Sequence, residues 1–335
     1  MKPIRWGMIG CGDVAEVKGG PGFYKARDSE LVAVMRRNGS LAADYARRHN
    51  VARWHDDADA IINAPDIDAV YIATLTDSHH EYTLRCAAAG KPAYVEKPMA
   101  LDATQCAEMI GACKAHRVPL WVGYYRRALP RFLAVRDLVA EGAIGEVRIV
   151  TVRQLKRSPS REELASAAIA WRSDPQLGGG IFFEAACHTF DALDFIIGAI
   201  KEVRAFADNQ ARAYPSEDMI VAAFSFENGV YGSGGWCYSA DQDEEYNEIV
   251  GSKGSIRFST FSPVPIRLTR GSGVEEIAIG DPPHVHQPLI QSIVDKLHGE
   301  GRCPSTGETA LRTARVMDAI LREFRERRTA RGEGR

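Results

Sequence analysis

The chain has 335 residues, of which 45% are hydrophobic and 26% are charged, and its formal net charge is −2. This length predicts two domains rather than one core. The balanced charge gives no basic surface that would attract nucleic acid, so a nucleic-acid partner is not expected. No apolar run approaches the roughly 20 residues of a membrane-spanning helix, so no membrane partner is expected either.

The cysteines and the first residues bear on location. Seven cysteines are scattered singly, without a C-x-x-C pair, which favours reduced thiols over disulfides or a metal site. The first residues lack the apolar core of a secretory signal. We therefore expect a cytoplasmic protein without a bound metal.

A strand predicted over residues 4–9 leads into Gly10-x-Gly12-x-x-Ala15. In a dinucleotide-binding turn the first glycine permits the tight turn, the second lets the backbone approach a pyrophosphate, and the third small residue keeps the helix close to its strand. The alternative is an ordinary glycine turn. Residues 19–22 (GGPG) interrupt the helix, where we expect a short helix or a loop. The turn residues expected at the cofactor are Gly10, Gly12, Asp13 and Val14.

The second predicted strand, 31–35, is followed directly by Arg36 and Arg37. An NAD-binding unit usually carries an acidic residue here, which bonds to the ribose 2′-hydroxyl. A guanidinium group suits a 2′-phosphate instead, because it pairs with phosphate oxygens. We therefore predict NADP(H) rather than NAD(H). The alternative is that the two arginines cap a surface loop.

The next segments alternate as in a doubly wound parallel sheet. The helices are expected at 41–49, 56–63, 78–89 and 102–116, and the strands at 68–74, 93–95 and 120–123. Ligands of such sheets bind beyond the carboxyl ends of the strands, which places Thr74, Thr76 and His79 after one strand and Glu96 and Lys97 after another. A charged pair at the tip of a buried strand is costly unless it is paired or used. His79 has an alternative role at the helix entry, bonded to backbone.

The pattern changes after residue 145, where long strands are predicted at 146–157, 203–212, 219–226, 230–239, 246–251 and 255–258. Residues 161–170 are expected to form a loop or short helix, and Asn228-Gly229 indicates a hairpin. A large antiparallel sheet with few covering helices favours a homodimer or homotetramer through its open face. Closing helices are expected at 286–298 and 309–327, packing back on one of the two domains, and the basic run 322–335 is interpreted as a solvated helix end.

The predicted fold class is therefore α/β with two domains. Residues 1–123 form a Rossmann-type, doubly wound parallel sheet that binds NADP. Residues 124–335 form an α+β domain with a large, mostly antiparallel open sheet, for substrate binding and oligomerisation.

A helix predicted over 181–197 follows a triple glycine and carries a second polar cluster. Glu184, His188 and Asp191 have the spacing i, i+4 and i+7, which places them on one helical face. A histidine flanked by carboxylates suits acid–base chemistry. The alternative is a polar stripe on an amphipathic helix.

Together these motifs resemble the glucose–fructose oxidoreductase / inositol dehydrogenase / rhizopine catabolism (Gfo/Idh/MocA) superfamily over nearly the whole chain, and 1,5-anhydro-D-fructose reductase-like members look most similar. The segments that carry the resemblance are 10–15, 73–79, 89–91, 96–98 and 178–191. The resemblance implies Lys97 and His188 as the catalytic pair. Glu184 stands where the family usually has aspartate, Thr76 where many members have asparagine, and Ala186 where glycine is common.

The resemblance also implies an activity, namely NADP(H)-dependent hydride transfer to or from a sugar, keto-sugar or polyol. His188 would act as acid or base, and Lys97 would stabilise charge on the reacting oxygen. One alternative is an NAD(P)-binding regulator without turnover, and another is a dihydrodiol or biliverdin-type reductase. The side chains expected at the substrate are Tyr124, Tyr125, Arg126, Trp171, Arg172 and Asp191.

Overall fold

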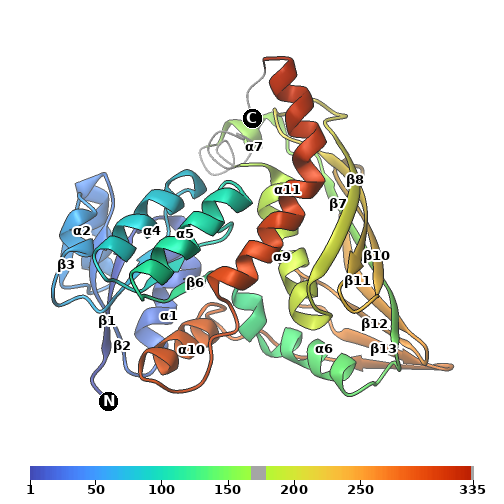
Figure 1. Ribbon diagram of the computed structural model, residues 1–335, viewed down its shortest axis with the longest axis horizontal. Helices are drawn as coiled ribbons and strands as arrows, with labels where there is room; N and C mark the ends of the chain where they lie inside the picture. The colour runs from blue at the N-terminus through green and yellow to red at the C-terminus, as the bar shows by residue number, and fades with distance from the viewer. Residues whose placement is uncertain (167–178, 333–335) are drawn as a thin grey trace. The chain divides into compact units, whose positions relative to one another are not determined.

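The computed structural model describes residues 1–166 and 179–332. The chain divides into two compact units (Figure 1). The first unit contains Met1–Leu129 and Pro282–Leu311, and the second contains Pro130–Asp281 and Arg312–Arg335. A late segment of the chain therefore belongs to the same unit as the N-terminal half.

The first unit is built on a parallel sheet of six strands in the order β3-β2-β1-β4-β5-β6. The strands are β1 (Ile4–Ile9), β2 (Ser29–Met35), β3 (Arg53–His55), β4 (Ala69–Ile72), β5 (Ala93–Val95) and β6 (Leu120–Val122). Strands β4, β5 and β6 are buried at every position, as apolar runs covered on both faces should be. The strand order reverses between β1 and β4, the place where such sheets bind dinucleotides. The Rossmann topology predicted from the alternating pattern is confirmed.

Short helices belong to the same unit as these strands. They are α1 (Gly20–Lys25), α2 (Gly39–Arg48), α3 (Asp59–Ile62), α4 (His79–Ala88), α5 (Ala103–Ala115) and α10 (Gln287–Leu297), with the 3-10 turns η2 (Thr76–Ser78) and η3 (Tyr125–Ala128). Side chains fix two of the starts, because Asn38 accepts from the backbone N–H of Leu41 and Asp102 from that of Gln105.

The helix after the glycine turn is irregular, as the GGPG stretch suggested. A π-helical turn, η1 (Ala15–Gly19), passes directly into α1, with a proline in its first turn. Proline is tolerated there because its missing N–H lies where no intrahelical bond is made. Of the two expected alternatives, the short helix is the one that forms.

The second unit contains a mixed sheet of eight strands in the order β14-β13-β12-β11-β7-β10-β9-β8. Strands β7 and β10 pair in parallel and the other neighbours pair antiparallel. The strands are β7 (Val147–Arg157), β8 (Ile200–Asp208), β9 (Met219–Phe226), β10 (Tyr231–Ala240), β11 (Glu244–Gly251), β12 (Ser255–Phe258), β13 (Ile266–Arg270) and β14 (Gly273–Ile277). The mostly antiparallel sheet is confirmed, as is the hairpin at Asn228-Gly229 between β9 and β10.

Two details of this sheet differ from the prediction. Strand β8 ends at Asp208, four residues before the predicted end, because the carboxylate of Asp218 accepts from the backbone N–H groups of Gln210 and Ala211 at 2.7 and 2.8 Å and turns the chain out of the sheet. Strands β13 and β14 were not predicted. Strand β14 is exposed along most of its length, so it has no apolar alternation that would reveal it.

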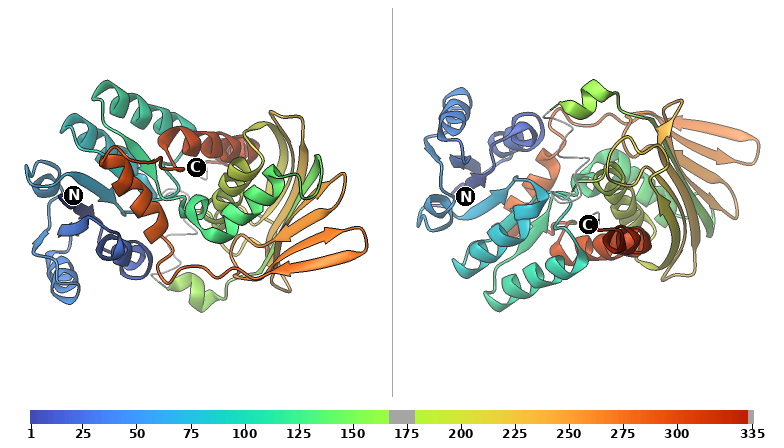
Figure 2. Two further views of the ribbon diagram at one scale, coloured as in Figure 1. Left: turned by 90° about the horizontal axis from the view of Figure 1, so that it is seen from below. Right: turned by 90° about the horizontal axis from the view of Figure 1, so that it is seen from above.

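Helices cover one face of this sheet. They are α6 (Pro130–Ala140), α9 (Ile181–Ile196) and the second-unit part of α11 (Gly307–Ala330), and the views in Figures 1 and 2 show no helix among the described residues of this unit over the opposite face. The short helix α7 (Arg161–Ala165) begins with a capping box at Ser160 and Glu163. Phe182 and Phe190 of α9 pack on Trp236 of β10 at ring separations of 5.4 and 5.3 Å. The core of this unit therefore lies between α9 and the inner face of the sheet.

The end of α11 is more than a solvated helix end. Arg327 donates to the carbonyl of Ala207 at 2.7 Å, and Arg328 donates to the carbonyl of Pro215 at 2.5 Å. These two arginines hold the end of β8 and the segment that leads to β9. Arg328 is 8% exposed, so the interpretation of this basic run as solvent-facing is wrong for Arg328, whereas Arg327 is exposed.

All seven cysteines are free. Among the helices of the described ranges, none has the length and apolar character that crossing a bilayer requires.

Candidate functional site

The glycine turn after β1 has room for a dinucleotide. Gly10 has φ +96°, and a Cβ on it would lie 2.7 Å from the carbonyl group of Ala73, so only glycine fits. Within the described residues, a Cβ on Gly12 would meet nothing within 4 Å, which leaves the backbone open to a bound group. The turn is fixed by the Met35 carbonyl, which accepts from the N–H groups of Gly10 and Cys11 at 2.8 and 3.2 Å. These features fit a pyrophosphate held over the turn.

Two arginines follow β2 at the same edge of the sheet. Arg36 is half-buried and its backbone N–H donates to the carbonyl of His55 at 3.2 Å, while Arg37 is exposed. Burial raises the pKa of the Cys11 thiol to about 11, and the positive charge of Arg36 opposes this rise, so the guanidinium lies near the glycine turn. Helix α2, which follows the two arginines, is capped by the side chain of Asn38.

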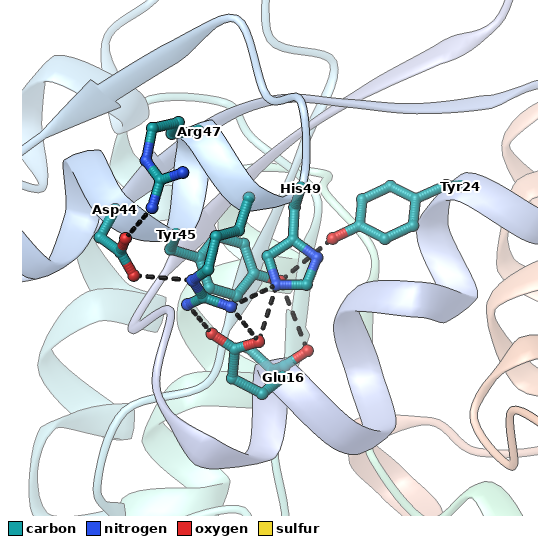
Figure 3. A network of polar contacts seen from close by, with 8 residues as sticks. Glu16, Tyr24, Asp44, Tyr45, Arg47 and His49 are labelled. Carbon is teal, nitrogen blue, oxygen red and sulfur yellow. Dashed lines mark hydrogen bonds and ion pairs between the residues drawn. The ribbon is translucent and has the colours of Figure 1, made fainter.

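The neighbouring charges pair with one another (Figure 3). Glu16 of η1 bonds to Arg48 and, at 2.7 Å, to His49 Nε2, and Asp44 bonds to Arg47 and Arg48 at 2.6 and 2.7 Å. Hydrogen bonds from Arg48 hold the pKa of Glu16 below its usual range. This network ties the helix after the glycine turn to α2.

Arg36 and Arg37 differ from the neighbouring arginines in their ion pairs. Arg48 and Arg53 form ion pairs with Glu16 and Asp66, whereas in the described part of the chain neither Arg36 nor Arg37 lies within ion-pair distance of a carboxylate. Their charges are therefore available to an anion.

His79 joins the ends of two strands. Its ring is 1% exposed, with Nδ1 2.9 Å from the carbonyl oxygen of Pro98 and Nε2 3.1 Å from that of Thr74. Ser78 Oγ also donates to Thr74 Oγ1 at 2.8 Å, and Thr76 is buried in η2. This is the backbone-bonded alternative for His79. Contacts of Thr74, Thr76 and His79 with a cofactor remain predictions.

Glu96 turns inward at the end of β5. Glu96 is 6% exposed. Tyr71 Oη donates to its Oε1 at 2.6 Å, and the backbone N–H of Lys97 donates to its Oε2 at 3.2 Å. These donors compensate for the burial of a carboxylate. Lys97, half-buried, begins the loop beyond the strand. The sequence analysis places both Glu96 and Lys97 at the cofactor, which stays a prediction. In the structure the Glu96 carboxylate accepts a hydrogen bond from the Lys97 backbone and so supports it.

The residues after β6 are also buried. Tyr125 and Arg126 lie in η3, each 7% exposed, with the guanidinium carbon 4.9 Å from the centre of the tyrosine ring. Tyr124, also buried, precedes this turn. Trp171 and Arg172 lie outside the described residues.

The second polar cluster lies on a buried helix. Helix α9 starts after Gly180, which has φ +142° and whose carbonyl accepts from the N–H of Glu184 at 2.8 Å. His188 and Asp191 are 7% and 1% exposed, and the His188 ring lies 6.1 Å from that of Phe261. Most of α9 is buried, so this cluster is not the solvent-facing stripe of an amphipathic helix.

The two groups of predicted residues belong to different units. Gly10, Arg36, Thr74 and Lys97 follow the carboxyl ends of neighbouring strands in the first unit, whereas Glu184, His188 and Asp191 belong to the second. Tyr71 and His286 in the first unit and Glu217 in the second are among the buried polar residues that sequence reasoning missed. None lies in a motif, and their contacts come from distant parts of the chain.

A Rossmann sheet with an open glycine turn, together with a second unit built on a large mixed sheet, is the architecture of a two-domain dinucleotide-binding protein. Residues 4–124 match the model of the oxidoreductase family with NAD-binding Rossmann fold, and residues 132–257 match the GFO/IDH/MocA C-terminal domain. The chain is 37% identical to Oxidoreductase P35 of Formosa agariphila, over 95% of this chain and 98% of that protein. It belongs to the Gfo/Idh/MocA family of NAD(P)-dependent oxidoreductases, and the resemblance seen in its motifs is confirmed.

More distant relatives have named activities. The chain is 26% identical to 1,5-anhydro-D-fructose reductase of Ensifer adhaerens, over 91% of each chain. The crystal structure of aldose–aldose oxidoreductase from Caulobacter crescentus, complexed with glycerol, superposes with a TM-score of 0.84 at 25% identity and covers 98% of this chain and 99% of that one.

Proposed function

We propose that this protein is an NADP(H)-dependent oxidoreductase that transfers a hydride between the nicotinamide and a sugar, keto-sugar or polyol in the cytoplasm. The observation that carries the cofactor choice is the pair of guanidinium groups of Arg36 and Arg37, available at the end of β2 where an acidic residue would select NAD(H). The named activities of the reductase and the aldose–aldose oxidoreductase support the substrate class.

Residues of both units have roles in this proposal. When bound, the nicotinamide supplies or accepts the hydride. His188 would donate a proton to the reacting oxygen during reduction and accept one during oxidation. Lys97 would stabilise the negative charge that develops on that oxygen. Glu184, one turn before His188, would orient the imidazole or bond to the reacting hydroxyl, in place of the aspartate usual in the family.

The remaining predicted residues would form the two binding regions. Polyols suit flat aromatic faces together with groups that bond to hydroxyls, so Tyr125, Arg126 and Asp191, with Trp171 and Arg172, are proposed at the substrate. The proposed cofactor contacts are Gly10, Gly12, Asp13, Val14, Arg36, Arg37, Thr74, Thr76, His79, Glu96 and Lys97.

Titration with NADPH and NADH, followed by fluorescence, tests the cofactor choice. Arg36→Asp should weaken NADPH binding by about tenfold or more, because it removes a charge-assisted bond and adds a repulsive carboxylate. NADH binding should change little. Arg47→Asp is the matched control, since Arg47 is exposed and lies on α2. Native preference for NADH, or an equal effect of both substitutions, contradicts the proposal.

Turnover separates the two kinds of protein that bind NADP(H). A panel of ketoses, aldoses and polyols, with NADPH or NADP⁺, should give turnover with at least one compound. A protein that binds NADPH but turns over nothing in the panel, nor any planar aromatic diol, is instead the regulator without activity. Activity limited to aromatic diols supports the dihydrodiol-type alternative.

A further inference from the structure

A closed polar pocket surrounds the carboxylate of Glu96, the residue before Lys97. Tyr71 Oη donates to Oε1 and the backbone N–H of Lys97 donates to Oε2. His286 Nδ1 lies 3.6 Å from Oε1, and a Cβ on Gly123 would lie 3.0 Å from Oε2. Because two of these groups lie against each carboxylate oxygen, the carboxylate has little freedom.

His286 is itself held on two sides. Its ring is 1% exposed, Nδ1 lies 3.1 Å from Tyr94 Oη, and the ring centre lies 4.4 Å from that of Tyr125. Burial lowers the pKa of His286 to about 4, so the ring is neutral at pH 7. The 3.6 Å separation of Nδ1 from Glu96 Oε1 exceeds a hydrogen-bond length, so Nδ1 faces the carboxylate as a polar neighbour and is held in that place by its hydrogen bond with Tyr94 Oη.

The segment that carries His286 also contacts the helix after the glycine turn. Gln287 Nε2 donates to the carbonyl of Lys25 at 3.1 Å, and the N–H of Arg27 donates to Gln291 Oε1 at 2.7 Å. A Cβ on Gly22 would lie 2.5 Å from Ile290 Cδ1, so α10 and α1 approach closely. These contacts fix the start of α10, and therefore His286, within the first unit.

We propose that His286 is a positioning residue for Lys97: by closing the pocket around the Glu96 carboxylate, it fixes the Lys97 backbone and so the direction of the amine. The inference rests on the proposed function, in which Lys97 acts on the reacting oxygen. A displacement of about 1 Å in a positioned group costs on the order of 100-fold in rate. The glycine turn and Arg36, which carry the cofactor choice, follow the ends of other strands, β1 and β2, so NADPH binding should change much less than turnover when this pocket is altered.

Two substitutions separate positioning from packing. In His286→Asn the amide nitrogen can occupy the place of Nδ1, whereas His286→Phe keeps an aromatic ring beside Tyr125 but removes both ring nitrogens. The positioning role predicts that H286F lowers kcat at least tenfold while the dissociation constant of NADPH changes less than threefold. H286N should keep kcat within about threefold of the native value. His298→Phe, at the other end of α10, is the control.

A second measurement is independent of turnover. Trinitrobenzenesulfonate, a small amine-reactive reagent, modifies lysine side chains. Mass spectrometry compares its rate of modification of Lys97 with its rate for exposed Lys114 in the same sample. The ratio should change at least threefold in H286F and stay unchanged in H286N and H298F. If H286F does not fold, His286→Gln, whose amide nitrogen reaches the place of Nε2, replaces it with the same expectation.

The two readouts distinguish the possible failures. An unchanged Lys97 ratio in folded H286F overturns the positioning role, whether or not the native protein has activity. Equal losses in H286N and H286F that follow their thermal stabilities also overturn it. If the ratio changes in H286F but the native protein turns over no compound, the positioning role is supported and only the proposed function is contradicted.

Discussion

At the residue scale, the first question is whether Lys97 and His188 perform the chemistry assigned to them. Lys97→Ala and His188→Ala should each lower kcat by about 10²–10⁴, because each removes a positioned group that carries charge or a proton in the reaction. Steady-state turnover on the best compound of the panel measures this. Lys114→Ala and His116→Ala, both at exposed positions near the end of α5, are the controls. Native-like turnover in either K97A or H188A would contradict the assignment.

Some individual residues of the candidate site can be predicted from the sequence, and others cannot. Gly10 was predictable because the tight turn needs a glycine there, and the place of Lys97 just beyond a strand was predictable because β5 is an apolar run; the role of Lys97 stays a prediction. His286 was not predictable, since its neighbours Tyr94 and Glu96 lie about 190 positions earlier and no spacing links them. Motifs record contacts that are local in the chain, whereas the support behind them comes from through-space packing.

At the element scale, the start of α9 depends on a buried carboxyl group. Glu217 is 5% exposed, and a Cβ on Gly180 would lie 3.0 Å from its Oε1. Burial raises its pKa from 4.5 to about 7, against the opposing effects of a backbone N–H bond from Phe183 and the charges of Arg325 and Arg328. The folded protein therefore binds this proton more tightly than the unfolded chain does.

The raised pKa of Glu217 makes the free energy of unfolding depend on pH in a direction that can be measured. Between pH 4.5 and 7 the folded state holds the Glu217 proton and the unfolded state does not, so the free energy of unfolding falls as the pH rises through that window. Glu217→Gln removes the titration and keeps an oxygen for the helix N–H. It should stabilise the protein above pH 7 by on the order of 3 kcal/mol relative to its effect at pH 4.5.

Urea unfolding at pH 5 and pH 8 tests the expectation. The advantage of E217Q should grow with pH, whereas Glu227→Gln, at an exposed position before the β9–β10 hairpin turn, should follow the native protein. Parallel curves for E217Q and the native chain would show that Glu217 does not titrate in this range.

The bounds of strands and helices were predicted well in some places and poorly in others. Strand β1 and helix α9 were placed correctly because their apolar content or period is strong. The end of β8 was misplaced because a single side chain, Asp218, turns the chain away from the sheet. Exposed β14 carries no such pattern. Boundaries set by side-chain bonds, and edge strands facing solvent, are where sequence periodicity gives too little information.

At the scale of the whole molecule, the uncovered face of the second sheet remains to be explained. Phe206 is 84% exposed and Tyr231 67%, and Val221 and Ile149 are also exposed. Phe206 pairs with Val221 across β8 and β9, and Tyr231 pairs with Ile149 across β10 and β7, so apolar side chains extend over four adjacent strands. We propose that a second copy of the chain covers this face in a homodimer or homotetramer, because exposed apolar surface of this kind is stabilised by burial.

A charge at the centre of that exposed surface should prevent association. Phe206→Glu would place a carboxylate where an apolar ring is buried in the oligomer, and burying an unpaired charge costs more than the contact contributes. Sedimentation equilibrium should give a dimer or tetramer mass for the native chain and a monomer mass for F206E. Val264→Glu, a similarly apolar and 49% exposed residue in the loop after β12, should keep the native mass. A native monomer at micromolar concentration, or an F206E protein that still associates, would show that this face has no partner copy.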